Sequence, residues 1–211
     1  MDRIVFREME KKELRECAHI AAQAFMSYTY FSNYIPDDKK REAFLERLIL
    51  CEFKANYGLK ETVILTAVRD GKPVAVAHLC SPSFEKPSDL RYVLKGWLGV
   101  LNAGGSKDVN AWNEMQKEAG DPCHRLGGKT WYLSLLTVAQ QEERKGIGSA
   151  FIGQFIIPYV KEHGGEALCL FTNSEENRKF YTRNGFKEFD SRSFDYKGKS
   201  VGSWSLVIPV K

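Results

Sequence analysis

A turn rich in glycine and basic residues, Arg144-Lys145-Gly146-Ile147-Gly148, separates an apolar strand-like run from a long apolar helical pattern. The start of a helix leaves about four backbone N–H groups without intrahelical partners and carries roughly half a positive charge. Glycines let those amides come close to an anion, and Arg144 and Lys145 add side-chain charge. The segment therefore predicts a phosphate-binding turn at the beginning of the helix.

The spacing of the glycines limits which phosphate ligand this turn suits. A P-loop needs G-x-x-x-x-G-K-[ST], which the chain lacks. The dinucleotide fingerprint G-x-G-x-x-G also fails, because the glycine that follows Gly148 is Gly153. A bare G-x-G pair is equally typical of an ordinary helix start, so the turn by itself leaves both interpretations open.

A second motif follows about one strand and one helix later. Asn177, Tyr181, Gly185 and Phe186 form the pattern N-x-x-x-Y-x-x-x-G-F after the apolar run 168–172. With Val138 and the G-x-G turn before it, in this order, the pattern resembles the GNAT superfamily of N-acetyltransferases, which use acetyl-CoA. The resemblance implies an α/β fold: a mixed central sheet with helices on both faces and a helical insertion between the third and fourth strands.

The likeness is nearest to the branch that includes puromycin N-acetyltransferase, and it is strongest over 131–186. It rests on Trp131-Tyr132-Leu133, Phe171-Thr172 and Phe180-Tyr181. Two positions depart from the usual pattern: Glu143 replaces a Gln or Arg, and Phe171 replaces a glutamate that often follows the strand's leucine. A carboxylate at position 143 would repel a pyrophosphate, so we expect Glu143 to face solvent.

The resemblance also implies roles for individual residues. Tyr181 is the expected general acid for the departing thiolate. Asn177, one helical turn earlier on the same face, is expected to bind the cofactor. The central strand is expected to splay from its neighbour and expose its backbone to acetyl-CoA. The remaining cofactor contacts are expected from Leu136, Thr137, Val138, Arg144, Lys145, Gly146, Ile147, Gly148 and Ser149.

The general base is not evident from the residues. His19, His78 and His124 are candidates only because histidine titrates near neutrality. On the central strand, Tyr132, Ser134 and Leu136 are expected to share one face, which holds no carboxylate. A water relay or an acceptor amine that is already neutral stays open.

Aromatic residues in the N-terminal half are candidates for an acceptor pocket. A loop between helices that is rich in aromatic rings can line a pocket for an organic amine, or can simply belong to the core. The candidates are Tyr28, Tyr30, Phe31, Tyr34 and, on an inserted helix, Trp97.

The periodicity of apolar residues predicts the elements that hold these groups. Strands are expected over 4–9, 62–68, 74–79, 130–138, 168–172, 186–195 and 201–210, with a hairpin at Asp70-Gly71. Helices are expected around 14–25, 44–49, 147–163 and 175–183. Pro158 should kink the third of these or end its regular part. Between residues 83 and 128 lies an insertion with one apolar helical stripe, then a shorter helix with Val109, Trp112 and Met115. The stripe is formed by Leu90, Leu94, Trp97, Leu98 and Leu101.

Length and composition bound the class of protein. The chain has 211 residues, 43% of them hydrophobic, which suits one domain over 1–211. No apolar run approaches the ~20 residues of a membrane span, and the start of the chain lacks the layout of a signal peptide. Five scattered cysteines without a C-x-x-C pair suggest neither a zinc site nor a disulfide framework, and reduced thiols in a cytoplasmic protein are expected.

The charge and the motifs together define the expected activity. A net charge of +4 is too small, and too scattered, to indicate nucleic-acid binding. We expect transfer of acetyl from acetyl-CoA to a primary amine of a small molecule. The amine is expected to attack directly in a ternary complex, because Cys169 has no evident base beside it and an acyl-cysteine intermediate is therefore not expected. A protein or peptide N-acetyltransferase and a non-catalytic CoA-binding module remain as alternatives, and monomer and homodimer are both open.

Overall fold

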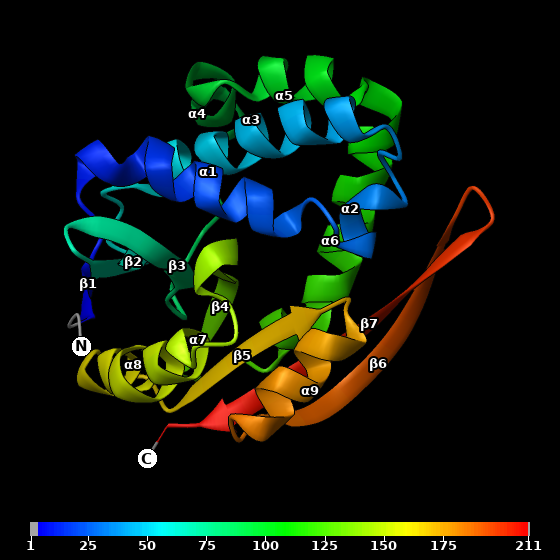
Figure 1. Ribbon diagram of the computed structural model, residues 1–211. Coiled ribbons are helices and arrows are strands. Elements are labelled where there is room, and N and C mark those ends of the chain that lie inside the picture. The colour runs from blue at the N-terminus through cyan, green and yellow to red at the C-terminus, as the bar shows by residue number, and fades with distance from the viewer. Residues whose placement is uncertain (1–3, 211) are drawn as a thin grey trace.

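The computed structural model describes residues 4–210, in which seven strands form one mixed sheet (Figure 1). Its order is β1-β2-β3-β4-β5-β7-β6, and only β4 and β5 run parallel to each other. The strands are β1 (Val5–Glu8), β2 (Thr62–Arg69), β3 (Lys72–Cys80), β4 (Thr130–Val138), β5 (Ala167–Thr172), β6 (Lys187–Tyr196) and β7 (Lys199–Pro209). Residues 1–3 lie outside the described range. The expectation that the start of the chain is not a signal peptide depends partly on them, so it stays a prediction.

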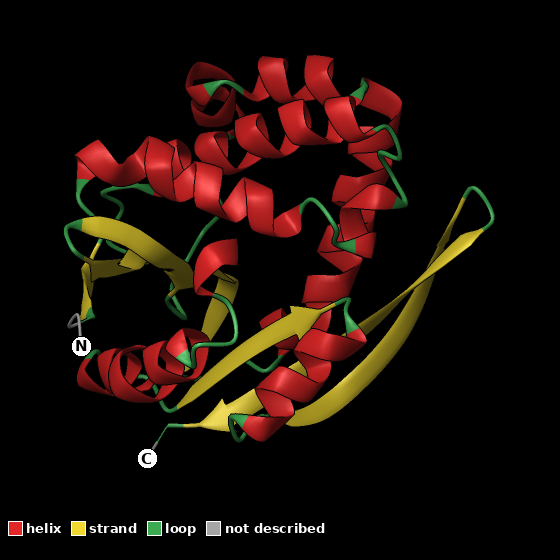
Figure 2. Cartoon of the chain, in the orientation of Figure 1, coloured by secondary structure: helices red, strands yellow, loops and turns green. Residues whose placement is uncertain are grey.

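Helices cover both faces of this sheet, as predicted (Figure 2). Alternate side chains of a strand point to opposite faces, so Ile64 and Leu65 enter two different cores. The first core lies under α1 (Leu14–Phe25), α3 (Asp38–Asn56), α5 (Trp97–Gly104) and α6 (Ser106–Arg125). The second lies under α7 (Ile147–Phe151), α8 (Ile157–Glu162) and α9 (Glu175–Arg183). The short α2 (Thr29–Ser32) follows α1, and 3-10 turns occupy Lys11–Glu13 and Gln140–Glu142.

Local signals explain why several elements begin where they do. The β2–β3 hairpin turns at Asp70 and Gly71, which both have positive φ, as a two-residue loop that follows the strand twist requires. The Asp37 side chain accepts a hydrogen bond from the Lys40 N–H at 2.8 Å and caps α3. Ser174 caps α9 in the same way through the Asn177 N–H at 3.3 Å.

The helical insertion between β3 and β4 differs from the predicted pattern. Gly96, with φ of 117°, divides the predicted stripe into α4 (Asp89–Lys95) and α5. Leu90, Leu94 and Leu98 are therefore not core residues, and their side chains are 69%, 74% and 63% exposed. The predicted shorter helix is instead the 20-residue α6, which runs from the insertion down to the sheet (Figure 1).

The helix that follows the glycine turn continues past Pro158, but not as a regular α-helix. A π-helical turn over Ile152–Ile156 separates α7 from α8. Proline has no N–H to donate, and its ring collides with the carbonyl four residues earlier in an α-helix. The wider turn just before Pro158 accommodates both effects, so the helix ends only at Glu162.

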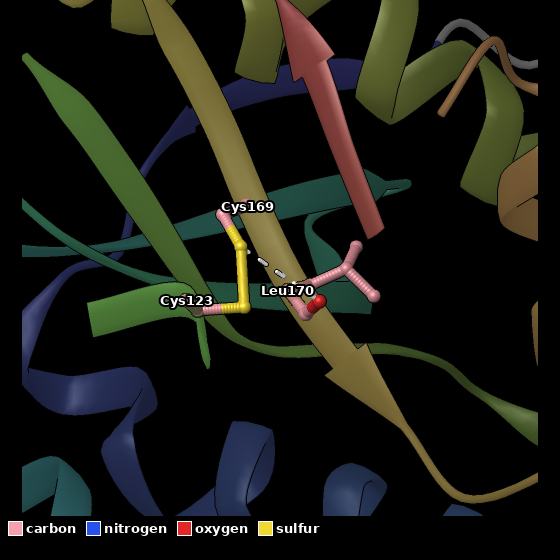
Figure 3. The surroundings of a disulfide bond; sticks show 3 residues. All are labelled: Cys123, Cys169 and Leu170. Carbon is pink, nitrogen blue, oxygen red and sulfur yellow. Dashed lines mark hydrogen bonds between the residues drawn. A yellow bond between two sulfur atoms is a disulfide. The ribbon is translucent and has the colours of Figure 1, made fainter. Parts of the chain in front are cut away.

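Two cysteines form a disulfide, which corrects the prediction of reduced thiols without a disulfide. Cys123 near the end of α6 is bonded to Cys169 on β5, with their Cα atoms 5.9 Å apart (Figure 3). The partners are 46 residues apart, and only the packing of α6 on β5 brings them together, so their spacing carried no signal. Cys17, Cys51 and Cys80 are free and buried. Within residues 4–210, no helix is both long and apolar enough to cross a membrane.

Candidate functional site

The centre of the sheet opens between β4 and β5. The two strands pair at only three positions, the last being Tyr132 with Cys169. Beyond Tyr132, β4 continues to pair with β3 on its other side as far as Val138. Over the described residues, the edge of β4 from Leu133 onward therefore has no strand partner toward β5, and its backbone groups on that side are free to bind a ligand.

A β-bulge in β4 sets the direction of the side chains next to this opening. Leu133 pairs with Leu79 and Leu135 with His78, so Ser134 is an extra residue without a partner on β3. Leu133 and Leu136 pack toward α7, whereas Leu135 packs toward α3. The prediction that Tyr132, Ser134 and Leu136 share one face is therefore wrong, because the extra residue shifts the alternation.

A cavity of about 560 Å³, here called the outer cavity, lies against the open part of β4. Its walls come from the end of α1, the turn before α7 with the start of that helix, and one face of α9 along its length. Nearly all of the predicted cofactor residues line it: Leu136, Thr137, Val138, Arg144, Gly146, Ile147, Gly148, Ser149 and Asn177. The volume falls within the ~300–1,000 Å³ that is typical of small-molecule sites.

The turn at one wall of the outer cavity has the backbone form that an anion site needs. Arg144 and Gly146 have φ values of 60° and 79°, so the chain folds back sharply just before α7. The N–H groups of Ile147, Gly148 and Ser149 belong to the first helical turn, where no intrahelical acceptor exists. A Cβ at Gly148 would lie 3.1 Å from the Phe180 ring, so this close packing of the turn against Phe180 favours glycine.

The charged residues are distributed differently from the prediction. Lys145 does not line the outer cavity, and its ammonium group lies 3.3 Å from the carboxylate of Glu142, which also binds Arg69. Arg183, at the end of α9, does line the cavity and was not predicted. Glu143 is exposed, as expected, although it borders the cavity.

A second cavity of about 150 Å³, here called the inner cavity, lies between α3, α6 and β4. Tyr28, Tyr30 and Phe31, three of the candidates for an acceptor pocket, line it. Two other aromatic candidates lie elsewhere: Trp97 packs against Tyr92 with ring centroids 6.1 Å apart, and Tyr34 stacks on Tyr196 at 4.4 Å.

The two cavities meet at residues that line both of them: Phe25, Tyr28, Leu136, Asn177 and Tyr181. The Tyr28 hydroxyl is fixed there, since it lies 2.8 Å from the Thr172 hydroxyl and accepts a 2.7 Å hydrogen bond from the Asn173 N–H. The Tyr181 hydroxyl makes no hydrogen bond to any residue in the described range. Burial, and secondarily the neighbouring Tyr28, raises the pKa of Tyr181, so the phenol stays protonated.

The histidine candidates are separated by their positions. His78 lines the inner cavity, and burial lowers its pKa to about 4. Its Nε2 atom is buried without a hydrogen-bond partner. His19 is exposed beside Glu46, and His124 is exposed with its ring 5.0 Å from that of Tyr132. Neither of these two lines the outer or the inner cavity.

A carboxylate that the prediction missed also lines the inner cavity. Glu52 comes from α3, where Leu45, Leu48, Ile49 and Phe53 form the buried face. Its position four residues after Leu48 places it on that same apolar stripe. An acidic residue at this spacing was the sequence signal that could have revealed it.

Comparison with known proteins supports the fold. No protein-family model matches the chain, and no curated protein is significantly similar to it in sequence. Solved structures do match over nearly the full length. One from Corynebacterium glutamicum, named histone acetyltransferase HPA2 and related acetyltransferase, is 19% identical with a TM-score of 0.63, covering 97% of this chain and 96% of that one.

Two further structures extend the comparison. An acetyltransferase assigned to the GNAT family, from Desulfovibrio desulfuricans, is 15% identical with a TM-score of 0.55 and covers 99% of this chain and 100% of that one. The PaiA N-acetyltransferase of Thermoplasma acidophilum, in complex with coenzyme A, is 14% identical with a TM-score of 0.53, at 95% and 98% coverage. The chain therefore has the fold of GNAT-type acetyltransferases.

Proposed function

We propose that the chain is an acetyl-CoA-dependent N-acetyltransferase that acts on a primary amine of a small molecule, carried by one domain over 1–211. The observation that carries this proposal is the meeting of the two cavities. A large cavity with a phosphate-type turn joins a small aromatic cavity at the free hydroxyl of Tyr181, beside the unpaired edge of β4. From the sequence resemblance alone, we also propose that its nearest branch is the one that includes puromycin N-acetyltransferase.

The residues of the outer cavity fit acetyl-CoA. The turn and the start of α7 offer N–H groups for the pyrophosphate, and Arg144 and Arg183 add positive charge. The open edge of β4 offers backbone groups to an amide-containing arm, and the buried Thr137 hydroxyl has no partner in the described range. When bound, acetyl-CoA would supply an activated thioester acyl group at the junction.

Tyr181 is the proposed donor at the departing sulfur. Because burial raises the pKa of Tyr181, the phenol holds its proton more tightly than a thiol with a pKa near 8.5. Complete proton transfer to a thiolate is therefore uphill, and the hydroxyl acts by hydrogen bonding to the charge that develops there. Asn177 lies one turn earlier on α9 and lines both cavities with it.

The acceptor amine must lose a proton before it can attack, since a free alkylammonium has a pKa near 10.4. His78 is neutral at pH 7, but with a pKa of about 4 it is too weak a base for this task. The amine is therefore proposed to enter neutral or to lose its proton through water. Neither cavity is lined by a cysteine, which supports direct attack without an acyl-cysteine.

The size of the inner cavity favours a small acceptor over a protein, although one of the similar structures is named after histone acetyltransferases. The test is release of free CoA thiol from acetyl-CoA with a panel of amines: aminonucleosides, aminoglycosides, alkyl amines, diamines and lysine peptides. Release with small amines is the expected result. Release with peptides alone would replace the proposal by protein acetylation. Acetyl-CoA binding without release for any amine would indicate a non-catalytic CoA-binding module.

A further inference from the structure

The inner cavity contains one carboxylate among otherwise aromatic, aliphatic and neutral polar side chains. Glu52 reaches it from α3, and none of the residues between 4 and 210 that line the cavity is a Lys or an Arg. The walls include the rings of Tyr30, Phe31, Trp112 and Phe171. Aromatic faces of this kind attract cations and also accept the hydrocarbon part of a ligand.

The two oxygens of Glu52 have different surroundings. Oε2 accepts hydrogen bonds from the Tyr92 hydroxyl at 2.9 Å and from the Asn56 side-chain amide at 3.3 Å. Oε1 has no hydrogen-bond partner within residues 4–210, and no basic group there lies within ion-pair distance. Lys86 acts on the carboxylate only from a distance, with its ammonium group 5.3 Å from the centre of the Tyr92 ring. One oxygen is thus held in place, and the other is free for a ligand.

An enclosed carboxylate without a cation is costly. Burial raises the pKa of Glu52, because the charged form loses hydration that its hydrogen bonds to Tyr92 and Asn56 restore only in part. A positively charged group on Oε1 would restore the missing interaction. The cavity is therefore suited to a ligand that carries a cation to this point.

The position of Glu52 separates it from the reacting end. Burial and then the charge of Glu52 raise the pKa of Cys80 to about 12, and Cys80 pairs with Tyr132 on β4. The junction lies at Leu136, which pairs with Ala77, three register positions along β3 from Cys80, or roughly 10 Å at ~3.3 Å per residue. Asn56, whose side-chain amide donates to Glu52, also accepts a 2.9 Å hydrogen bond from the Thr62 hydroxyl at its carbonyl, and Thr62 pairs with Cys80. Glu52 thus lies toward the end of the cavity away from the junction.

We propose that the acceptor is a diamine, with a second cationic group at the far end from the reacting amine, and that the Glu52 carboxylate binds this second group. This inference rests on the proposed function, since it places the reacting amine beside Tyr181. The chain between the two groups lies along the aromatic walls. Glu52 positions the acceptor and is not the base that removes the proton.

The experiment compares α,ω-diaminoalkanes with n-alkylamines of the same lengths, by CoA thiol release. The wild-type protein should favour the diamine in kcat/KM by about 10- to 100-fold, the size of one charge-assisted contact, with an optimum at one chain length because both ends are held. Glu52→Gln should remove this preference by raising KM for diamines more than for monoamines of the same length. Glu42→Gln, an exposed position on the same helix, should keep the preference.

Three outcomes would overturn the inference. The first is a wild-type protein that shows no preference for diamines over monoamines. The second is a Glu52→Gln variant that lowers kcat equally for both series, since that result assigns Glu52 to proton removal. The third is calorimetric binding of a diaminoalkane that is as tight to Glu52→Gln as to the wild type. The calorimetric arm needs no turnover, so it still decides the diamine site if no amine is acetylated and the proposed function itself fails.

Discussion

Tyr181→Phe removes a hydroxyl group and leaves the rest of the side chain in place. The ring lies 5.1 Å from that of Phe180 and 5.5 Å from that of Phe186, and both contacts belong to the ring alone. Because the hydroxyl has no hydrogen-bond partner within residues 4–210, its loss breaks no internal bond. We expect the free energy of unfolding to change by less than about 0.5 kcal/mol.

The effect on turnover should be much larger than the effect on stability. If the hydroxyl stabilises the charge on the departing sulfur, its loss should slow turnover by roughly ten- to a thousand-fold, which corresponds to about 1.4–4 kcal/mol in the transition state. The affinity for acetyl-CoA should stay close to wild type, since the phosphate turn and the β4 edge are untouched. A large loss of turnover with an unchanged affinity for acetyl-CoA would identify a chemical role for the hydroxyl.

The assay is CoA thiol release under saturating acetyl-CoA, together with calorimetric affinity and thermal unfolding. Tyr159→Phe is the matched control, since its hydroxyl donates to Glu8 at 3.2 Å and lies outside both cavities. It should turn over at the wild-type rate. Wild-type turnover by Tyr181→Phe would refute the role of the hydroxyl. A loss of acetyl-CoA affinity as large as the loss of rate would reassign Tyr181 to binding.

Three further predictions test other parts of the structure. Gly148→Leu should weaken acetyl-CoA binding at least tenfold in calorimetry because its side chain must displace Phe180 or enter the outer cavity, and unchanged affinity would contradict the phosphate-turn assignment. Reduction of the bond between Cys123 and Cys169, which closes a 46-residue loop, should lower the free energy of unfolding in urea by about 2–4 kcal/mol, and no shift would show that the bond does not stabilise the fold. The unfolded chain protonates His78 near pH 6.5, but the folded protein does so only near pH 4. The free energy of unfolding should therefore fall by up to about 3 kcal/mol as the pH drops from 6.5 to 4, and His78→Gln should make this pH dependence weaker. An identical slope in the variant would remove His78 from the explanation.

Regular elements with strong local signals were predictable from the sequence. The bounds of β4 and α9 agree with the predicted ranges 130–138 and 175–183, because alternation in the strand and a capping Ser174 define them locally. The splay between β4 and β5 followed from the resemblance. The prediction of one continuous stripe from Leu90 to Leu101 is wrong, because Gly96 divides it into two helices. Trp97 and Leu101 pack against the first core, whereas Leu90, Leu94 and Leu98 are exposed, since helical spacing alone does not show whether a partner surface exists.

The candidate site was predictable where one segment supplies several residues, and not where distant segments meet. The turn 144–149, apart from Lys145, and the pair Asn177 and Tyr181 line a common cavity. Glu52 reaches the inner cavity, and Cys123 reaches Cys169, only through the packing of α3 and α6 on the sheet. The bulge at Ser134 depends on the pairing of β4 with β3, which a single strand does not encode.

The short pairing of β4 with β5 divides the sheet into two parts that are weakly connected to each other. Strands β1 to β4 form one plate and β5, β7 and β6 another, and only three residue pairs form the seam between them. At the open end, Tyr28 in the segment after α1 contacts Thr172 and Asn173 at the end of β5, whereas the disulfide joins α6 to β5 at Cys169, the last position that pairs with β4. A ligand in the gap would form backbone hydrogen bonds where β4 and β5 do not pair. Its binding would therefore also make the connection between the two plates more rigid.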